Sequence, residues 1–274
     1  MKRILVPTDF SKHAEEALKS AVQIAKKNGS EIFLLHLLEL PHQLHDAMTN
    51  GSSIPEVMLF IKKAHEKLQK IKEQPHLQGI TISTTVQFER AFDGILSFNK
   101  KNNIDLIVMG SSGSSGIEEM LIGSNTEKVV RLSDIPVLVV KKDLDTFNIK
   151  NIVFASDFTK EIKKPFLKMI EFANIFDANL ALVMICTPNS FKTTAIAKKT
   201  MKDFIADFEV KNYSINIYND SNIEKGIRNF TNTIGADLIG LCTHGRTGLS
   251  HFFNGSIGED LVNHSTKPVI TFKI

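Results

Sequence analysis

An internal repeat constrains the fold of this chain more than any other feature of its sequence. Three blocks recur in the same order: RILVPTDFSK (3–12) as NIVFASDFTK (151–160), IDLIVMGSSG (104–113) as ADLIGLCTHG (236–245), and IGSNTEKVVRLSDIPVLVV (122–140) as NGSIGEDLVNHSTKPVITF (254–272). This shared order indicates a tandem duplication. The polar stretch KKDLDTFNIK separates the copies, and we predict domains at residues 1–143 and 149–274.

Strands and helices are predicted to alternate within each copy. Short apolar runs such as RILVP, EIFLLHLLEL and IDLIVM are typical of buried strands. Helical spacing predicts a first helix with an apolar stripe and a second one containing Phe60, Ile61 and Leu68; the stripe comprises Ala14, Leu18, Ala21, Val22 and Ala25. Residues 41–58 are predicted to be a loop insertion. Apolar strands between amphipathic helices indicate an α/β fold, with two tandem, five-stranded, doubly wound parallel domains.

Composition and charge narrow the functional classes. Of the 274 residues, 42% are hydrophobic and 23% charged, which is typical of a soluble globular protein. The net charge of +3 comes without a clustered basic face, so we predict no nucleic-acid binding. The apolar stretch near the N-terminus is too short for a signal peptide, and the apolar run 180–186 is too short for a membrane span. With two distant cysteines, these features predict a cytoplasmic protein with no membrane association.

A glycine-rich loop, MGSSGSSGIEEMLIGS (109–124), follows the fourth predicted strand of the first copy. In doubly wound sheets, ligands bind at the carboxyl ends of the strands. Gly110, Gly113 and Gly123 allow a positive φ and a close approach by another group. A helix is predicted to begin after Gly123, and its free N–H groups and dipole favour an anion. Backbone donors and a serine hydroxyl could therefore hold a phosphate without a lysine.

The same residues also allow purely structural roles. Ser124 to Glu127 and Ser256 to Glu259 both fit a capping box, and Asp9 fits a cap on the first helix. The loop lacks the Gly-Lys-Ser/Thr of a P-loop, and it does not follow the first strand as a dinucleotide fingerprint does. Spacing alone leaves phosphate binding and helix capping both open.

The combined pattern resembles the universal stress protein family. Gly110, Gly113 and the Gly123–Ser124 pair match the family's G-2x-G-9x-G-S/T nucleotide motif. ILVPTDFS, LLHLLE and EKVVRLSDIPVLVV also resemble family segments, and the likeness extends over both copies. The resemblance implies two adenine-nucleotide alpha hydrolase-like domains. It also implies that the edge strands IPVLVV and KPVITFKI pair, so that the chain forms a pseudo-twofold dimer; a further homodimer stays open.

The resemblance also implies a ligand, ATP with or without Mg²⁺, and a set of residues that bind it. Asp9, with Pro7 beside it, would meet the nucleoside, and Leu37, which follows His36, would contact adenine. His36 itself is interpreted as a satisfied core histidine. The ribose and phosphates would be held by Met109, Gly110, Gly113, Gly123, Ser124 and Asn125.

The second copy departs from this pattern. Its matching residues are Asp157, Ile185, Gly245, Gly255 and Ser256, but Cys242 replaces Gly110 and Ala155 replaces Pro7. A positive φ at a non-glycine residue costs about 1–2 kcal/mol. Arg246 adds a charge near the expected phosphates, but an exposed cation contributes only about 1 kcal/mol. We therefore expect one tight site per chain, in the first copy.

Three functions compete on the sequence alone. The leading hypothesis is a non-enzymatic or very slowly hydrolysing ATP-binding protein with a regulatory role in stress. An ATPase or adenylyl-transferring enzyme would need a lysine, arginine or metal-binding carboxylate at the phosphates, where the loop offers only Glu118 and Glu119. The third is a scaffold without nucleotide. No metal site is predicted, because His244 and His251 lack partners at ligand spacing.

Overall fold

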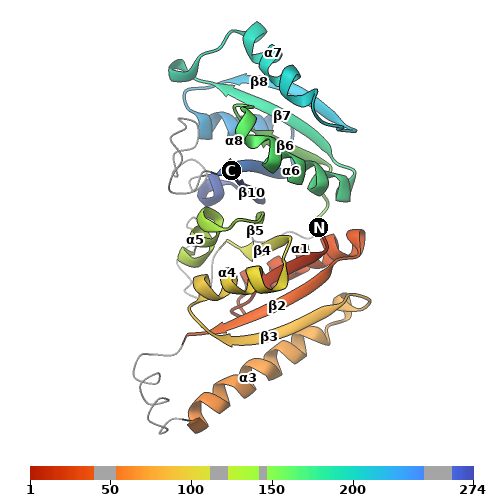
Figure 1. The fold of residues 1–274 in the computed structure, drawn as a ribbon, viewed down its shortest axis with the longest axis vertical. Helices are drawn as coiled ribbons and strands as arrows, with labels where there is room; N and C mark the ends of the chain where they lie inside the picture. Colours follow the sequence, from red (N-terminus) through yellow and green to blue (C-terminus); the bar gives the residue numbers. More distant parts are fainter. Residues whose placement is uncertain (40–53, 112–122, 142–146, 244–260) are drawn as a thin grey trace.

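A computed structural model describes residues 1–39, 54–111, 123–141, 147–243 and 261–274. Its strands are β1 (Arg3–Pro7), β2 (Glu31–Leu38), β3 (Ile82–Phe88), β4 (Leu106–Gly110), β5 (Val137–Val140), β6 (Asn151–Ala155), β7 (Asn179–Cys186), β8 (Tyr213–Asn219), β9 (Leu238–Thr243) and β10 (Val269–Lys273). They form one ten-stranded sheet in the order β3-β2-β1-β4-β5-β10-β9-β6-β7-β8 (Figure 1). Each half is a parallel, doubly wound sheet, so the predicted fold class is confirmed.

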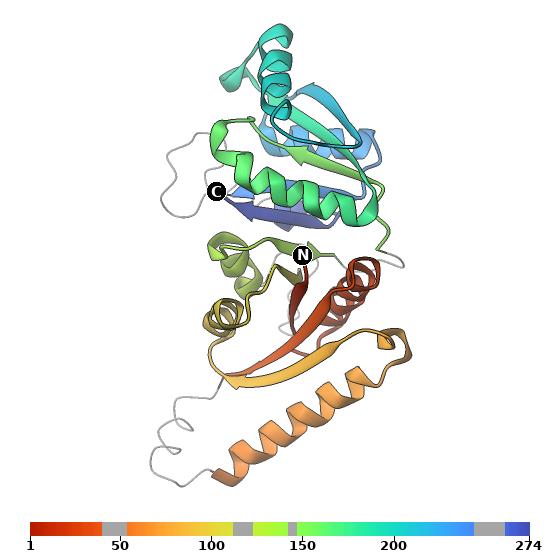
Figure 2. The same cartoon turned by 45° about the vertical axis from the view of Figure 1, so that its right-hand side comes forward.

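Helices cover both faces of this sheet. They are α1 (Lys12–Asn28), α3 (Ile54–Lys72), α4 (Ala91–Asn102), α5 (Ser124–Leu132), α6 (Lys163–Phe176), α7 (Thr194–Ile205) and α8 (Ile223–Thr233), with short 3₁₀ helices at Pro75–Leu77, Lys160–Ile162 and Pro188–Ser190. Buried side chains of α1, α3, α6 and α7 belong to one core cluster, and those of α4, α5 and α8 belong to another. Figure 2 shows the two halves stacked along the long axis of the molecule. Over the described ranges, no helix is both long and apolar enough to cross a bilayer.

Strands β5 and β10 join the two halves. They are antiparallel, with Val139 opposite Val269 and Leu138 opposite Ile270. All the other strand pairs in the sheet are parallel. The prediction that the two edge strands pair with each other is confirmed, and each strand satisfies the backbone groups that the other would expose. The domain division at 1–143 and 149–274 stays a prediction.

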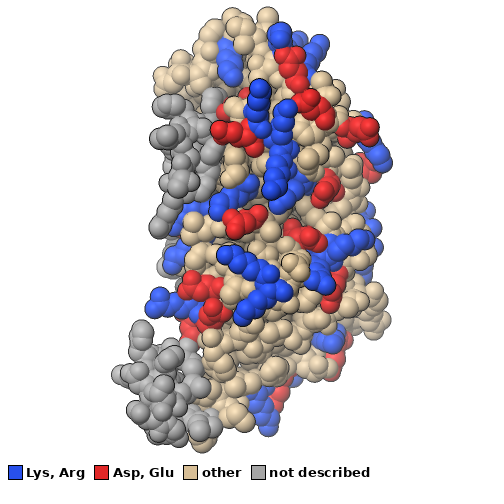
Figure 3. Space-filling view, in the orientation of Figure 1, with Lys and Arg blue, Asp and Glu red and all other residues tan. Residues whose placement is uncertain are grey.

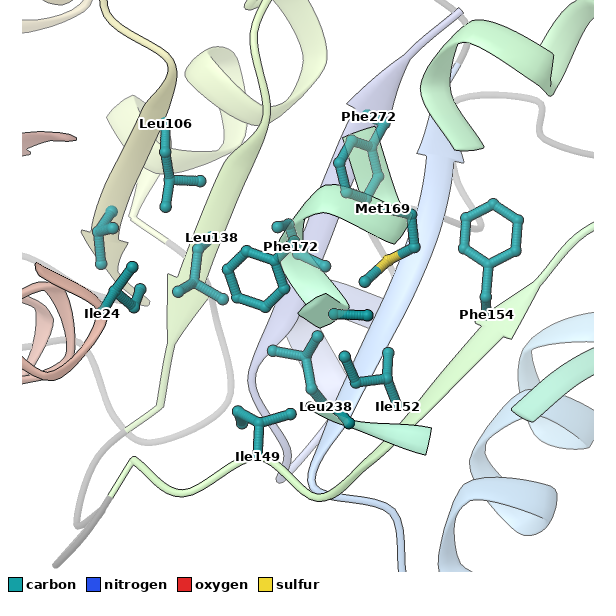
Figure 4. Packing of buried hydrophobic residues seen from close by; sticks show 14 of the residues in the cluster. Ile24, Leu106, Leu138, Ile149, Ile152, Phe154, Met169, Phe172, Leu238 and Phe272 are labelled. Atoms are coloured by element: carbon teal, nitrogen blue, oxygen red, sulfur yellow. The ribbon is translucent and has the colours of Figure 1, made fainter. Parts of the chain in front are cut away.

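The core is continuous across the junction between the halves. Figure 4 shows Phe172 of α6 beside Leu138 of β5, within one cluster that also holds Ile24 of α1. Phe147 and Ile149, from the stretch that we expected to be a polar linker, are buried in the same cluster. The Phe147 N–H donates to the Gln23 side-chain oxygen at 3.0 Å. Phe147 and Ile149 of the predicted linker are therefore part of the core, whereas Asn148 and Lys150 are exposed.

The segment before α3 differs from the expectation. The loop predicted over residues 41–58 is wrong at its end, because α3 already begins at Ile54; residues 40–53 lie outside the described part of the chain. Phe60 is 47% exposed, whereas Val57 and Leu68 are buried. The expectation is therefore confirmed for Leu68 and wrong for Phe60.

Charged side chains of both signs are interspersed on the face of the molecule shown in Figure 3. The ion pairs of the described chain include pairs along a helix, such as Lys199 with Asp203 at 2.9 Å. Exposed pairs of this kind contribute only about 0–1 kcal/mol each, so the stability of the fold rests on the two apolar clusters.

Candidate functional site

A cavity of about 330 Å³ lies at the carboxyl ends of β1, β2 and β4, beside the start of α5. Of the described residues, fifteen line it: Pro7, Thr8, Asp9, Ser11, Ala14, Leu35, Leu37, Ala91, Ile95, Met109, Gly110, Gly123, Ser124, Asn125 and Thr126. Its volume is within the range of about 300–1,000 Å³ that is common for small-molecule sites.

The structure brings together eight of the nine residues that the first copy was expected to contribute. The ninth, Gly113, lies outside the described residues. Sequence reasoning missed Ser11, Leu35 and Ile95, which also line the cavity. Leu35 could have been found, because side chains two residues apart on a strand face the same side and Leu37 was already implicated.

A strained turn presents Asp9 to the cavity. Phe10 has a φ of 66°, which is uncommon for a residue with a side chain, and its N–H donates to Thr8 Oγ1 at 3.1 Å. The Ser11 N–H donates to Asp9 Oδ1 at 3.0 Å, which orients the carboxylate. Ser11, and not Asp9, is the N-cap of α1, since its hydroxyl accepts from the Ala14 N–H. Strain of this kind is often found at functional sites.

The apolar part of the lining comes from β2, α4 and β4. Leu35, Ile95 and Met109 are buried there, whereas Leu37 is half-buried at the end of β2. A Cβ on Gly94 of α4 would lie 2.4 Å from Leu37 Cδ2, so this glycine makes room for the leucine. The cavity therefore has an apolar floor that could accept one flat ring.

The start of α5 forms the opposite wall. The N-cap is Gly123, with a φ of −59°, and no side chain caps the helix. The predicted capping box at Ser124 is therefore wrong: Ser124 is the first helical residue, and Glu127 pairs with Arg131 at 4.0 Å instead. The first N–H groups of a helix have no partner within the helix, and Ser124 and Asn125 line the cavity.

Two hydrogen bonds hold this wall against β4. The Gly123 N–H donates to the Ser111 carbonyl oxygen at 2.9 Å, and Thr126 Oγ1 donates to the Gly110 carbonyl oxygen at 3.1 Å. They bring the two ends of the glycine-rich loop together. The helix terminus is thus held in place next to the ends of the central strands.

Gly110 is required for a different reason than the one we expected. Its φ and that of Gly123 are not in the left-handed region, so the expectation that these glycines supply a positive φ is wrong. A Cβ on Gly110 would lie 2.6 Å from the His13 carbonyl oxygen and 2.7 Å from His13 Cβ. The glycine lets the first turn of α1 pack directly against β4.

Charge in the site is sparse. Asp9 is the only ionisable residue in the described lining of the cavity. His36 lies behind the turn, where its Nδ1 is 2.7 Å from the Thr8 carbonyl oxygen, and burial lowers the pKa of its imidazole. This neutral ring donates to Thr8, as expected of a satisfied core histidine. An anion here would depend on backbone dipoles.

No cluster of three or more His, Cys, Asp or Glu side chains suited to a metal is found in the described ranges. Asp9, Ser124 and Asn125 are among the described lining residues that offer side-chain oxygens to a cation, beside the oxygens of a bound ligand. Hard cations such as Mg²⁺ accept that arrangement, because they bind through one or two carboxylates and substrate phosphates.

Comparison with protein families identifies the family of this chain. The model of the universal stress protein family matches residues 1–141 and 215–273, which together cover most of the chain. The chain belongs to the universal stress protein family.

Relatives of this universal stress protein include single-copy and full-length matches. The universal stress protein MJ0531 of Methanocaldococcus jannaschii is 34% identical over 52% of this chain and 82% of its own. Slr1230 of Synechocystis is 22% identical over the full length of both chains, which agrees with a tandem member.

Solved structures show the same fold. A universal stress protein from Archaeoglobus fulgidus superposes with a TM-score of 0.76 at 22% identity, over 99% of this chain and 98% of its own. A universal stress protein solved in complex with cAMP has a TM-score of 0.36 to this chain at 11% identity, over 46% of this chain and 97% of its own.

The second copy of this universal stress protein repeats the strained turn after the first strand but not the partly open apolar floor of the cavity. Phe158 has a φ of 57°, and the Thr159 N–H donates to Asp157 Oδ1 at 3.4 Å. Ile185, at the position of Leu37, is only 3% exposed. Cys242 is fully buried, and burial raises the pKa of its thiol, with a further contribution from the charge of Asp157. Gly245, Arg246, Gly255 and Ser256 lie outside the described residues.

Proposed function

We propose that this universal stress protein binds ATP in the cavity of its first copy and acts through nucleotide occupancy rather than rapid turnover. The single observation that supports the proposal is the convergence of Asp9, Leu37 and the start of α5 on one cavity. A buried apolar floor, an acceptor at the rim and a helix N-terminus are the three environments that a base, a ribose and a phosphate chain need.

Each part of the nucleotide has a matching group in the lining. Adenine would lie on the apolar floor beside Leu37. Asp9 would accept hydrogen bonds from the ribose hydroxyls, because its carboxylate lies in the lining and is oriented by the Ser11 N–H, and a carboxylate is an acceptor only. The phosphates would lie at the first turn of α5, near the hydroxyl of Ser124.

The absence of cations in the described lining argues against efficient phosphoryl transfer. Kinases and ATPases stabilise the charge of the transferring group with lysine, arginine and metal ions. Here Asp9 is the only charged side chain among the described residues of the cavity. We infer that bound ATP persists and biases the conformation or the partners of the chain.

The two copies are inferred to differ in affinity. The Leu37 side chain of the first copy is partly open to the cavity, whereas Ile185 is closed off at the corresponding place. We infer one tight site per chain, in the first copy.

Calorimetric titration of the intact chain with ATP, ADP and AMP, with and without Mg²⁺, tests the proposal. We expect a stoichiometry near one. Asp9→Ala should weaken binding by about 1.5–3 kcal/mol, roughly 10- to 150-fold, through the loss of a charged acceptor. The matched variant Asp157→Ala should keep wild-type affinity. Two equal sites, loss only with Asp157→Ala, or no binding of any nucleotide would contradict the proposal.

A further inference from the structure

A second cavity, of about 210 Å³, lies between α1 and α3 next to Phe10. Its apolar wall comes from Phe10, Ala14, Leu18 and Ile71, and Lys67 lies at its edge with Lys70 one turn further along α3. The cavity is distinct from the proposed nucleotide site. The two share only a few residues of the turn before α1 and of its first turn.

The chemistry of this cavity is amphipathic and positively charged. Lys67 Nζ lies 4.8 Å from the centre of the Phe10 ring, so the ammonium group is held over the cavity by a cation–π contact. Glu15 also borders the cavity; Lys19 pairs with it at 3.2 Å and with Glu16 at 2.7 Å, so the charge of Glu15 is offset in part. A ligand that matches this lining has an acidic group, which pairs with the two lysines of α3, and an apolar body, which contacts the apolar wall.

The second copy shows what a packed version of the same place looks like. Phe154 and Phe166 stand where the first copy has Val6 and Leu18, as the repeat aligns them. Phe166 is fully buried, and its ring centre lies 5.1 Å from that of Phe204 of α7.

The equivalent of Phe10 is also enclosed in the second copy. Phe158 is buried and packs on Phe204 at 5.5 Å between ring centres, whereas Phe10 is only half-buried. In the second copy, phenylalanine side chains therefore fill the space beside this turn and the helix that follows it. In the first copy, the equivalent turn and helix face a cavity that is bordered by lysines.

We propose that the cavity between α1 and α3 binds a small amphipathic anion, an acyl or aromatic carboxylate. The carboxylate lies between Lys67 and Lys70, and the apolar body contacts Phe10, Leu18 and Ile71. The volume is below the range of about 300–1,000 Å³ that is usual for drug-sized ligands, so the ligand is short.

Titration with octanoate, in the absence of nucleotide, tests this site independently of ATP binding. We expect saturable binding with a stoichiometry of one, and at least ten-fold weaker binding of octan-1-ol and octylammonium, which lack the negative charge. Leu18→Phe introduces the residue that the second copy has at this position, which should fill part of the cavity and lower the affinity for octanoate at least ten-fold.

A surface variant keeps the test valid if Leu18→Phe fails to fold. Lys67→Gln with Lys70→Gln should lower octanoate affinity at least ten-fold, while Lys63→Gln, an exposed lysine of the same helix outside the cavity, should leave it unchanged. No saturable octanoate binding, equal binding of octylammonium, or equal affinity of the Lys67/Lys70 and Lys63 variants would overturn the proposal.

Discussion

Replacing Gly110 by alanine tests whether helix packing requires this glycine. The new Cβ would lie 2.6 Å from the His13 carbonyl oxygen and 2.7 Å from His13 Cβ, where ordinary contacts begin at 3.4 Å. These neighbours are the backbone and the Cβ of α1, which cannot rotate away as the end of a flexible side chain would. The first turn of α1 must therefore retreat from β4.

The expected cost is that of overpacking a core, about 1–3 kcal/mol. For chains of 150–250 residues, 1 kcal/mol lowers the melting temperature by roughly 2–4 °C. Gly110→Ala should therefore melt about 2–12 °C below wild type by differential scanning calorimetry. ATP affinity should fall as well, because Ser11 and Ala14 at the start of α1 line the proposed nucleotide cavity.

Gly29→Ala is the matched control. Gly29 has a φ of 63°, and an added Cβ would meet no atom within 4 Å, so this variant costs about 1–2 kcal/mol through backbone strain alone. It should leave ATP affinity unchanged. If Gly110→Ala kept wild-type stability and lost only ATP affinity, the glycine would serve the ligand and our packing argument would be refuted.

Three further predictions concern other residues. Burial lowers the pKa of Lys141 to about 8, so between pH 8 and 10.5 the unfolded chain binds more protons than the folded chain. The free energy of unfolding of wild type, measured in urea melts, should therefore rise by up to about 3 kcal/mol relative to that of Lys141→Met as the pH rises. A difference between the two that does not change with pH would contradict this. Cys186 and Cys242 are buried, so neither thiol should react with an aromatic disulfide reagent before unfolding, and a fast native reaction would refute that placement. Gly123→Val should abolish ATP binding but keep the far-UV spectrum, because valine tolerates a φ of −59° and a ψ of 139°; undiminished affinity would remove the proposed site.

The fold could be predicted because its signals are local and repeated. Apolar runs between helices of period 3.6 indicated the parallel sheet, and α1 was expected almost where it lies. Recurrence of the same blocks made each copy a check on the other. The pairing of β5 with β10 came from the family resemblance rather than from the pattern of residues.

Details that depend on distances between elements could not be predicted. Nothing in the sequence says that α1 approaches β4 closely enough to exclude a side chain at Gly110. Phe10 is an unusual residue for a left-handed turn, so propensity rules argue against its conformation. The burial of Phe147 was hidden because its neighbours are polar and suggested a linker.

The pairing of β5 with β10 inside one chain changes how the two copies respond to dilution and to mutation. Covalent tethering makes the encounter of these strands intramolecular, so their pairing does not depend on protein concentration. In a symmetric homodimer every substitution appears on both sides of the interface. Here each substitution appears once, so one copy could fill its interior with phenylalanines while the other kept its cavities open.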